Sequence, residues 1–460
     1  MKHRRTGGLD RRQLLAAAPA AVLAACSTSR EASKAPPARA RNLLVVLADD
    51  LSGADLGCYG STNVRTPNVD ALAARGMLFE RAYTAVGVCQ PSRSSLYTGL
   101  YPTAHGALGF GPIAPGVATW PQMLGEAGVV TAMIGKLDVD PLEQFPFEHL
   151  VRSKDLESRR DSAVWRRELA SFLGAFGERR FAAVIALTDP HRPFDEEPGR
   201  APHTAPEALS VPGFLWDAPG VRADLAAYYD CVARLDQTVG ELMEALRVAG
   251  RADDTLVVFT SDNGAAFPFA KATLYEAGVR MPLIAAGPGV RAGARNGDFA
   301  SLLDLLPTAL EQFGAPPRAL DGRSLLAALR GDESSAPQHF VSMQTENNRE
   351  RSAPARALHT RRFKYIRNLT PEVAMVSNVV NHTASWEAGL ALARDDERVK
   401  ARMQSYLYRP AEELFDLERD PCELENLAAR PEHAERLAAM RAELRAWLAA
   451  RQDPALAQWA

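Results

Sequence analysis

The sequence LLVVLADD at residues 43–50 predicts the fold class of this chain. Its apolar residues run without interruption and stop at two carboxylates, Asp49 and Asp50. A short apolar run of this kind is typical of a strand that is buried on both faces of a parallel sheet. We therefore expect Asp49 and Asp50 to lie at the carboxyl end of a central strand.

The same pattern occurs three more times along the chain. Three further apolar runs are each followed by polar or charged residues, and they lie at residues 129–134, 181–187 and 256–259. Helical patterns separate the runs and lie at residues 69–75, 119–127, 165–176 and 223–249. This alternation predicts an α/β fold with a mostly parallel sheet.

Side chains that can carry out chemistry follow each predicted strand. They are Asp49, Asp50, Lys136, His191, Asp262 and Asn263. In open α/β sheets the carboxyl ends of the strands form the ligand crevice, so we expect these side chains to meet at one edge. Three carboxylates and an amide offer hard oxygen ligands, which suit Ca²⁺ or Mg²⁺ better than zinc.

The composition excludes several classes of protein. The chain has 460 residues, 47% of them hydrophobic, which rules out disorder, collagen and coiled coil. The net charge of -3 draws the chain neither to nucleic acid nor to an anionic membrane. Five scattered cysteines are too few for a disulfide framework. Cys58, Cys231 and Cys422 could be free or could include one disulfide.

The length predicts one large domain with a smaller one attached. We place the large α/β domain at residues 42–336, where an amphipathic helix is expected at 301–313. A smaller α+β domain is expected at residues 337–460. Strand patterns at 340–343 and 363–367 and a closing helical pattern at 434–449 mark this second domain.

The N-terminus has the pattern of an export signal over residues 1–26. Arg11-Arg12 ahead of an apolar stretch is similar to a twin-arginine signal, and residues 23–26, ending at Cys26, are similar to a lipoprotein cleavage box. Residues 27–41 would then form a tether. We expect a lipoprotein of the periplasm or cell envelope, held to the membrane only by its lipid on Cys26. The alternative is an ordinary secretion signal in which this cysteine is incidental.

Residues 89–93, Cys-Gln-Pro-Ser-Arg, contain the candidate nucleophile. Pro91 and Ser92 suit the start of a helix, so Cys89 should lie just ahead of a helix N-terminus, where an anion is favoured. Arg93 adds a fixed positive charge beside it. A lone cysteine is more often a buried apolar residue, so the spacing of its neighbours has to decide between the two interpretations.

Cys89-Gln90-Pro91-Ser92-Arg93 followed by Leu96-Tyr97-Thr98-Gly99 resembles the signature of the type I sulfatase family. Further landmarks of that family follow in family order over nearly the whole mature chain. They are Asp49-Asp50, Gly135-Lys136, Asp189-Pro190-His191, the segments at 261–264 and 271–276, Leu414-Phe415-Asp416 and Asp420-Pro421. The chain is most similar to N-sulfoglucosamine sulfohydrolases, also called sulfamidases. Asp189-Pro190-His191-Arg192 and the run at residues 358–369 carry that closer likeness.

The resemblance implies an alkaline-phosphatase-like sandwich and a formylglycine nucleophile, made from Cys89 by a separate maturation enzyme. It implies a cation, Ca²⁺ in preference to Mg²⁺, held by Asp49, Asp50, Asp262, Asn263 and residue 89. Arg93, Lys136 and Lys271 would neutralise the sulfonyl oxygens. His191 would donate a proton to the departing oxygen or nitrogen.

The sequence departs from the family pattern at two places. Lys136-Leu137-Asp138 stands where the family has a His two residues after the Lys. Asp138 could be a replacement base, a further cation ligand, or a sign of altered chemistry. The segment at residues 344–348 lacks the adjacent His residues of the sulfamidases, which bears on the substrate more than on the reaction.

We therefore expect a metal-dependent sulfatase that acts on a sulfated sugar in glycosaminoglycan degradation, by preference on glucosamine N-sulfate. One alternative is a glycan or aryl O-sulfatase, or a phosphate- or phosphonate-ester hydrolase of the same fold. Another is a surface lipoprotein that binds sulfated glycan without turnover. Charged segments at residues 347–356 and 361–362 are expected near the place where a polyanionic glycan enters.

Overall fold

The computed structural model describes residues 40–194, 204–332, 336–345 and 353–459, all within one compact unit that spans residues 38–460. The expected signal peptide, the lipidation site at Cys26 and nearly all of the tether lie outside the described residues. Among the described residues, no helix combines the length and the apolar character needed to cross a membrane.

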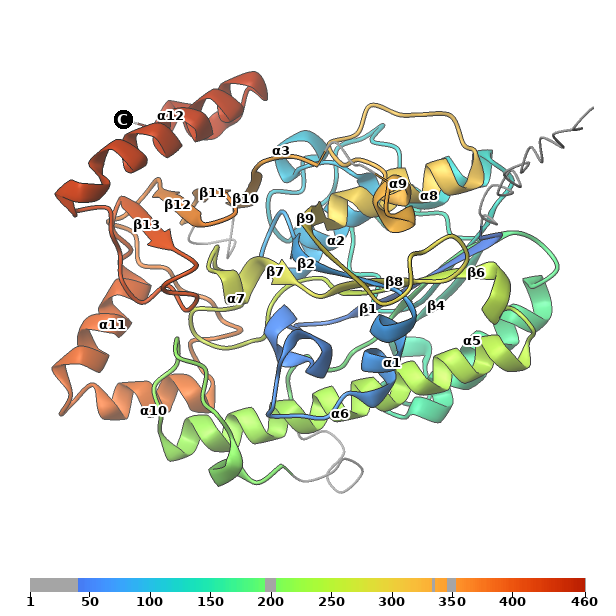
Figure 1. Cartoon of the computed structure of the whole chain (residues 1–460), viewed down its shortest axis with the longest axis horizontal. Helices are drawn as coiled ribbons and strands as arrows, with labels where there is room; N and C mark the ends of the chain where they lie inside the picture. Colours follow the sequence, from blue (N-terminus) through green and yellow to red (C-terminus); the bar gives the residue numbers. More distant parts are fainter. Residues whose placement is uncertain (1–39, 195–203, 333–335, 346–352, 460) are drawn as a thin grey trace, which may run out of the picture. The chain divides into compact units, whose positions relative to one another are not determined.

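A nine-stranded sheet forms the centre of the large domain (Figure 1). Its parallel part has the order β4-β3-β5-β1-β6, with bounds His149–Arg152, Val130–Gly135, Phe181–Ala186, Asn42–Ala48 and Thr255–Ser261. The rest is mixed and contains β8, β2, β7 and β9, with bounds Leu283–Ala286, Met77–Tyr83, Arg280–Met281 and Ala294–Ser301. The expected α/β class and the expected four strands are confirmed.

Helices cover both faces of this sheet. Leu44 and Val46 of β1 belong to a hydrophobic cluster that includes residues of α1 (Pro67–Arg75), α5 (Ser162–Phe176) and α6 (Pro219–Val248). Leu43, Val45 and Leu47 belong to a second cluster, which includes residues of α2 (Cys89–Thr98), α4 (Trp120–Glu126) and α8 (Leu305–Phe313). Alternate side chains of one strand thus enter two separate cores, as expected for a strand buried on both faces.

A four-stranded antiparallel sheet lies toward the C-terminus. Its order is β10-β11-β12-β13, with bounds Phe340–Gln344, Ala355–His359, Phe363–Asn368 and Glu412–Asp416. One face packs against α12 (Ala434–Ala450), whose Leu437, Met440, Leu444 and Leu448 are buried in the same cluster as Val341 and Leu414. The smaller α+β domain is confirmed, and its expected boundary near residue 337 stays a prediction.

Several short helices complete the described chain. They are α3 (Pro102–His105), α7 (Glu276–Val279), α9 (Leu326–Arg330), α10 (Ala384–Leu392) and α11 (Glu397–Leu407). Helix α7 connects the two sheets, because Lys364 of β12 forms an ion pair of 3.0 Å with Glu276. The small sheet therefore helps to fix the backbone just before α7, where Lys271 lies.

One of two further sequence-based expectations was confirmed and the other was wrong. The helix expected at 301–313 is confirmed, because Ser301 caps a 3-10 turn over Leu302–Asp304 that continues directly into α8. Arg356 is not part of a charged loop at a glycan entrance. It is buried in β11, where it forms an ion pair of 2.8 Å with Asp453.

Candidate active site

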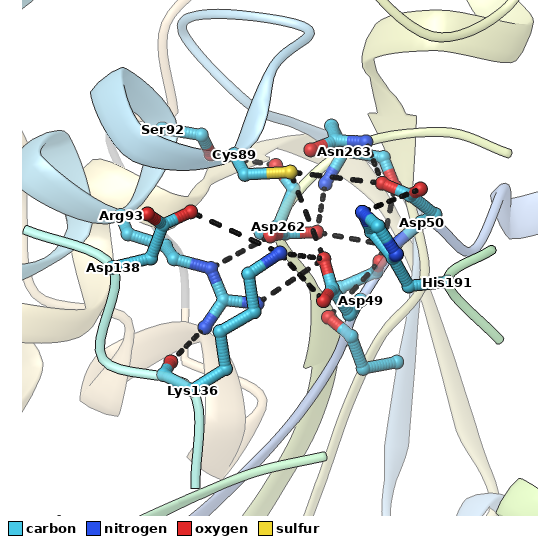
Figure 2. A network of polar contacts seen from close by, with 12 residues as sticks. Asp49, Asp50, Cys89, Ser92, Arg93, Lys136, Asp138, His191, Asp262 and Asn263 are labelled. Carbon is cyan, nitrogen blue, oxygen red and sulfur yellow. Dashed lines mark hydrogen bonds and ion pairs between the residues drawn. The ribbon is translucent and has the colours of Figure 1, made fainter. Parts of the chain in front are cut away.

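The polar residues that follow the parallel strands meet at one edge of the sheet, as predicted (Figure 2). Strand β1 pairs with β5 on one side and β6 on the other, so their carboxyl ends lie side by side. The backbone N–H of Asp262 donates to Ala48 O at 3.2 Å, and that of Asp49 donates to Asp189 O at 3.3 Å. These bonds place the Asp49, His191 and Asp262 segments beside one another.

Helix α2 begins at Cys89 and brings the candidate nucleophile to this edge. Every residue of the helix is buried, and Ser92 Oγ donates to Asp262 O at 2.6 Å. Cys89 was expected just ahead of the helix and is its first residue, directly after the extended Val88. Its Sγ lies 3.7 Å from Asp49 Oδ1 and 3.8 Å from Asp50 Oδ1.

Three cationic side chains each contact one of the three buried aspartates at this edge. Arg93 Nε donates to Asp262 Oδ2 at 2.8 Å, and Lys136 Nζ donates to Asp49 Oδ2 at 2.7 Å. Lys271 Nζ contacts Asp50 Oδ1 and lies 3.1 Å from Cys89 Sγ. The structure thus brings together all the residues that the sequence assigned to charge neutralisation.

Burial and the neighbouring positive charges shift the pKa values of the carboxyl groups in this cluster in opposite directions. Burial alone would raise the pKa of Asp49, but Lys136 and Arg93 hold that pKa well below its usual range. Burial raises the pKa of Asp262 to about 6 despite the contact with Arg93. Burial also raises the pKa of the Cys89 thiol well above its usual value. Groups with strongly shifted pKa values in one cluster are typical of functional sites.

Three of the five expected cation ligands, Asp49, Asp50 and Cys89, lie around one point together with His191. Asp49, Asp50, Cys89 and His191 each offer a ligand atom, and these atoms all lie within 4.8 Å of one another. Asn263 Nδ2 donates to Asp50 Oδ1 at 2.7 Å. His191 Nε2 lies 3.8 Å from Asp50 Oδ2, and sequence reasoning did not place this histidine among the ligands.

The residues present fit a hard divalent cation. Within the described part of the chain, Asp50 Oδ2 and Asn263 Oδ1 are buried and accept no hydrogen bond. Buried oxygen acceptors of this kind are normally satisfied, so a bound cation would account for both. Asp262 is more fully engaged, because its Oδ2 accepts from Arg93 and its Oδ1 accepts from two backbone N–H groups.

Asp138 lies at the margin of the cluster and points toward it (Figure 2). Its Oδ2 is 3.8 Å from Lys136 Nζ, and its side chain is 28% exposed. It does not belong to the four-residue group that includes Asp49 and His191. Asp138 is thus a neighbour of Lys136, whereas the described partners of Cys89 Sγ are Asp49, Asp50 and Lys271.

Sequence reasoning missed two buried arginines, Arg160 and Arg234, which both contact Asp189. Arg234 belongs to the largely apolar buried face of α6, and a charge on such a face is a signal that could have revealed it. Arg160 gives no comparable signal, because it lies outside any regular element.

Other expectations concern cysteines and the second sheet. Cys58, Cys231 and Cys422 are free, so none of them forms a disulfide with another.

The segments that were expected to bear on the substrate lie in and around the second sheet. Gln344 is buried, and its Oε1 accepts from Arg409 Nη1 at 3.2 Å. Residues 346–352, which include most of the charged segment expected near a glycan entrance, lie outside the described residues. The exposed Arg361 and partly exposed Arg362 form ion pairs with Asp298 and Asp416.

Comparisons with known proteins agree with this site. The family model described as Sulfatase matches residues 41–315. Human N-sulphoglucosamine sulphohydrolase is 34% identical over 91% of this chain and 91% of its own length. The structure of a 2-O GAG sulfatase is 21% identical with a TM-score of 0.70, covering 90% of this chain and 93% of that one. A structure in complex with its substrate D-glucosamine-2-N,6-O-disulfate is 18% identical with a TM-score of 0.69, covering 91% and 99%.

The two solved structures bear on the fold, and they agree with the alkaline-phosphatase-like sandwich that the sequence predicted. The family model and the human relative bear on the reaction, since both cover most of the segments that carry the site. The chain therefore belongs to the sulfatase family, and it is a hydrolase of sulfate esters or sulfamates.

Proposed function

We propose that this sulfatase removes the N-sulfate group of glucosamine in a sulfated saccharide, with a formylglycine nucleophile made from Cys89. One observation carries the proposal: Cys89 Sγ lies at the start of a buried helix, 3.1 Å from Lys271 Nζ and 3.7 Å from Asp49. The similarity to human N-sulphoglucosamine sulphohydrolase over 91% of both chains supports the choice of substrate.

The chemistry of the substrate explains why residue 89 has to be converted. Negative oxygens shield the sulfur of a sulfate ester or sulfamate, so attack needs a reactive oxygen and positive charge around the sulfonyl group. When present, formylglycine supplies a hydroxyl group for the attack and allows the aldehyde to form again as sulfate leaves. The proposal therefore includes a separate maturation enzyme that converts Cys89 to formylglycine.

The acidic residues would hold the cation. Asp49, Asp50, Asp262 and Asn263 are the proposed ligands together with residue 89, and their hard oxygens favour Ca²⁺. When bound, the cation would withdraw electron density from the sulfonyl oxygens and lower the pKa of the attacking hydroxyl.

The remaining side chains act on the substrate directly or by holding a cation ligand. Lys136 and Lys271 would face the sulfonyl oxygens, and Arg93 would hold Asp262 in place through the bond of 2.8 Å. His191 would protonate the departing nitrogen. Its side chain is 30% exposed, whereas Asp50 beside it is buried, so a substrate can reach the ring from the solvent side.

The alternatives make different predictions for substrate. An O-sulfatase, or a phosphate- or phosphonate-ester hydrolase on this fold, would prefer an ester to a sulfamate. The glycan-binding lipoprotein is no longer retained, because family membership identifies the chain as an enzyme.

The test uses the full mature chain, produced together with a formylglycine-generating enzyme. N-sulfoglucosamine, N-acetylglucosamine 6-sulfate, 4-nitrophenyl sulfate and 4-nitrophenyl phosphate are compared by kcat/KM, with Cys89→Ala as the inactive control. We expect the sulfamate to be the best sugar substrate, with release of free sulfate and glucosamine. Preference for the 6-sulfate or the phosphate ester by the wild type would contradict the proposed substrate.

We also propose that the chain is exported, by the twin-arginine route, and is lipidated on Cys26. The sequence pattern at residues 23–26, which ends at Cys26, supports this lipidation. In the native host, Cys26→Ala is expected to move the enzyme from the membrane fraction to the soluble fraction. An unchanged distribution would contradict lipid anchoring at this residue.

A further inference from the structure

Asp189, in the loop that follows β5, is held by two buried guanidinium groups. Arg234 of α6 donates from Nε to Oδ2 and from Nη2 to Oδ1, both at 2.7 Å. Arg160, from the segment between β4 and α5, also contacts Oδ1. Both arginines and the aspartate are almost fully buried, with 2% to 4% exposure.

Arg160 also binds the backbone on both sides of His191. Its Nη2 donates to His191 O at 2.8 Å and to Pro193 O at 2.7 Å. One rigid planar group therefore connects Asp189, His191 and Pro193. The five N–H donors of arginine in a fixed fork make such a multiple contact possible, and lysine cannot reproduce it.

The next residues of the loop are fixed to the same helix. Arg192 forms a bidentate ion pair with Asp224 of α6, with both contacts at 2.7 Å. Cys231 of α6 donates to Phe194 O at 3.3 Å. Helices α5 and α6 also pack against each other (Figure 1). Contacts with Arg160 and with α6 thus hold the backbone around His191 in place. The imidazole ring extends from this backbone toward Asp50.

Charge neutralisation alone does not explain this arrangement. One guanidinium group would balance Asp189, and Arg234 already does so with ideal bidentate geometry. What Arg160 adds is the pair of bonds to the backbone carbonyls of His191 and Pro193.

We propose that Arg160 is a positioning residue that fixes the His191 ring for proton donation to the leaving group. The inference rests on the proposed function, because it needs His191 as the proton donor. A donor has to lie within hydrogen-bonding reach of the leaving atom, and small displacements of a catalytic group reduce rates strongly. Arg160 need not touch the substrate to have this effect.

The test compares two leaving groups in the matured enzyme and in its Arg160→Lys variant. Departure of a sugar nitrogen needs a proton, whereas 4-nitrophenolate is stable enough to leave without one. We expect the variant to lose kcat/KM for N-sulfoglucosamine by on the order of 100-fold. Its kcat/KM for 4-nitrophenyl sulfate should change by about threefold or less.

The ratio of the two kcat/KM values for one sample is the decisive quantity. It does not depend on how much of the variant is folded or carries formylglycine, so partial misfolding does not obscure the result. Arg234→Lys, which keeps the charge but loses the bidentate contact, is expected to change the ratio in the same direction. Arg166→Lys is the matched control, because Arg166 links α5 to Glu241 of α6 at the surface.

Equal losses on both substrates in Arg160→Lys would overturn the inference and leave Arg160 a purely structural residue. Failure of the proposed function would give a different result, because the wild type itself would then not cleave N-sulfoglucosamine.

Discussion

Cys89 Sγ and Lys271 Nζ lie 3.1 Å apart, although 182 positions separate the two residues in sequence. Lys271 also contacts Asp50, and the side chains of all three residues are buried. Burial would lower the pKa of Lys271, but Asp50 and its neighbours raise that pKa above its usual value. In the proposed mechanism, the ammonium group of Lys271 would lie where negative charge develops during sulfuryl transfer.

Loss of that charge should reduce turnover. Lys271→Met is expected to lower kcat/KM for N-sulfoglucosamine by on the order of 100-fold, as when one stabilising donor of a transition state is removed. Lys271→Arg keeps the charge and should retain more of the activity. Lys400→Met, at an exposed position, is the control and should behave as the wild type. Wild-type activity in Lys271→Met would remove this lysine from the mechanism.

Removal of the cation should destabilise the fold as well as abolish activity. Asp49, Asp50 and Asp262 are buried close together, and a divalent cation would relieve their repulsion. Ca²⁺ at about 100 times its dissociation constant is expected to stabilise the folded state by about 3 kcal/mol relative to the chelated protein. Thermal unfolding with and without EDTA, followed by added Ca²⁺ or Mg²⁺, measures this effect.

In that experiment Asp50→Asn should lose most of the response to Ca²⁺. The exposed Asp253→Asn is the matched control and should keep it. Elemental analysis that finds no divalent cation in the fully active enzyme would contradict the proposed site.

Asp138 should adjust the charge of the site without taking part in bond breaking. Its carboxylate is 3.8 Å from Lys136 Nζ and is partly exposed, so its removal should strengthen anion binding by about two- to fivefold. Asp138→Asn is expected to lower KM for N-sulfoglucosamine with little change in kcat. A phosphate monoester, which carries more negative charge, should gain more than the sulfated sugar.

The exposed Asp140→Asn is the control for this variant. A loss of kcat on the order of 100-fold in Asp138→Asn would show instead that this residue is a base or a cation ligand.

His105 should make the fold sensitive to acid. Its Nδ1 accepts from the backbone N–H of Ala107, its Nε2 lies 3.0 Å from Ser95 Oγ of α2, and burial lowers its pKa to about 4. In the unfolded chain the pKa of His105 is near 6.5. Between pH 6.5 and about pH 4, His105 therefore binds a proton in the unfolded chain and stays neutral in the folded chain. Stability is therefore fully present above pH 6.5 and is lost as the pH falls toward 4.

The free energy of unfolding of His105→Gln should therefore fall less on acidification than that of the wild type, by up to about 3 kcal/mol. Urea unfolding at several pH values measures this difference. The exposed His382→Gln is the control and should keep the wild-type pH dependence. An identical pH dependence in His105→Gln and the wild type would rule out this role.

The sequence predicted those parts of the site that follow from local patterns. Asp49 and Asp262 each directly follow a buried strand that contains an apolar run, and parallel strands place such residues at one edge. Strand β9 was missed, because its sequence, ARNGDFAS, is largely polar and it forms a strand only by pairing with β2. Arg160 was missed for a related reason, since its burial depends on helices and loops distant in sequence.

The oxidation state of residue 89 tests the central claim most directly. Peptide mass spectrometry across residues 88–93 is the measurement, made on enzyme that was purified from its native host and shown to release sulfate. The account predicts that residue 89 has the mass of formylglycine, in a fraction that rises with specific activity between preparations. An unmodified cysteine at this position in a fully active preparation would contradict it.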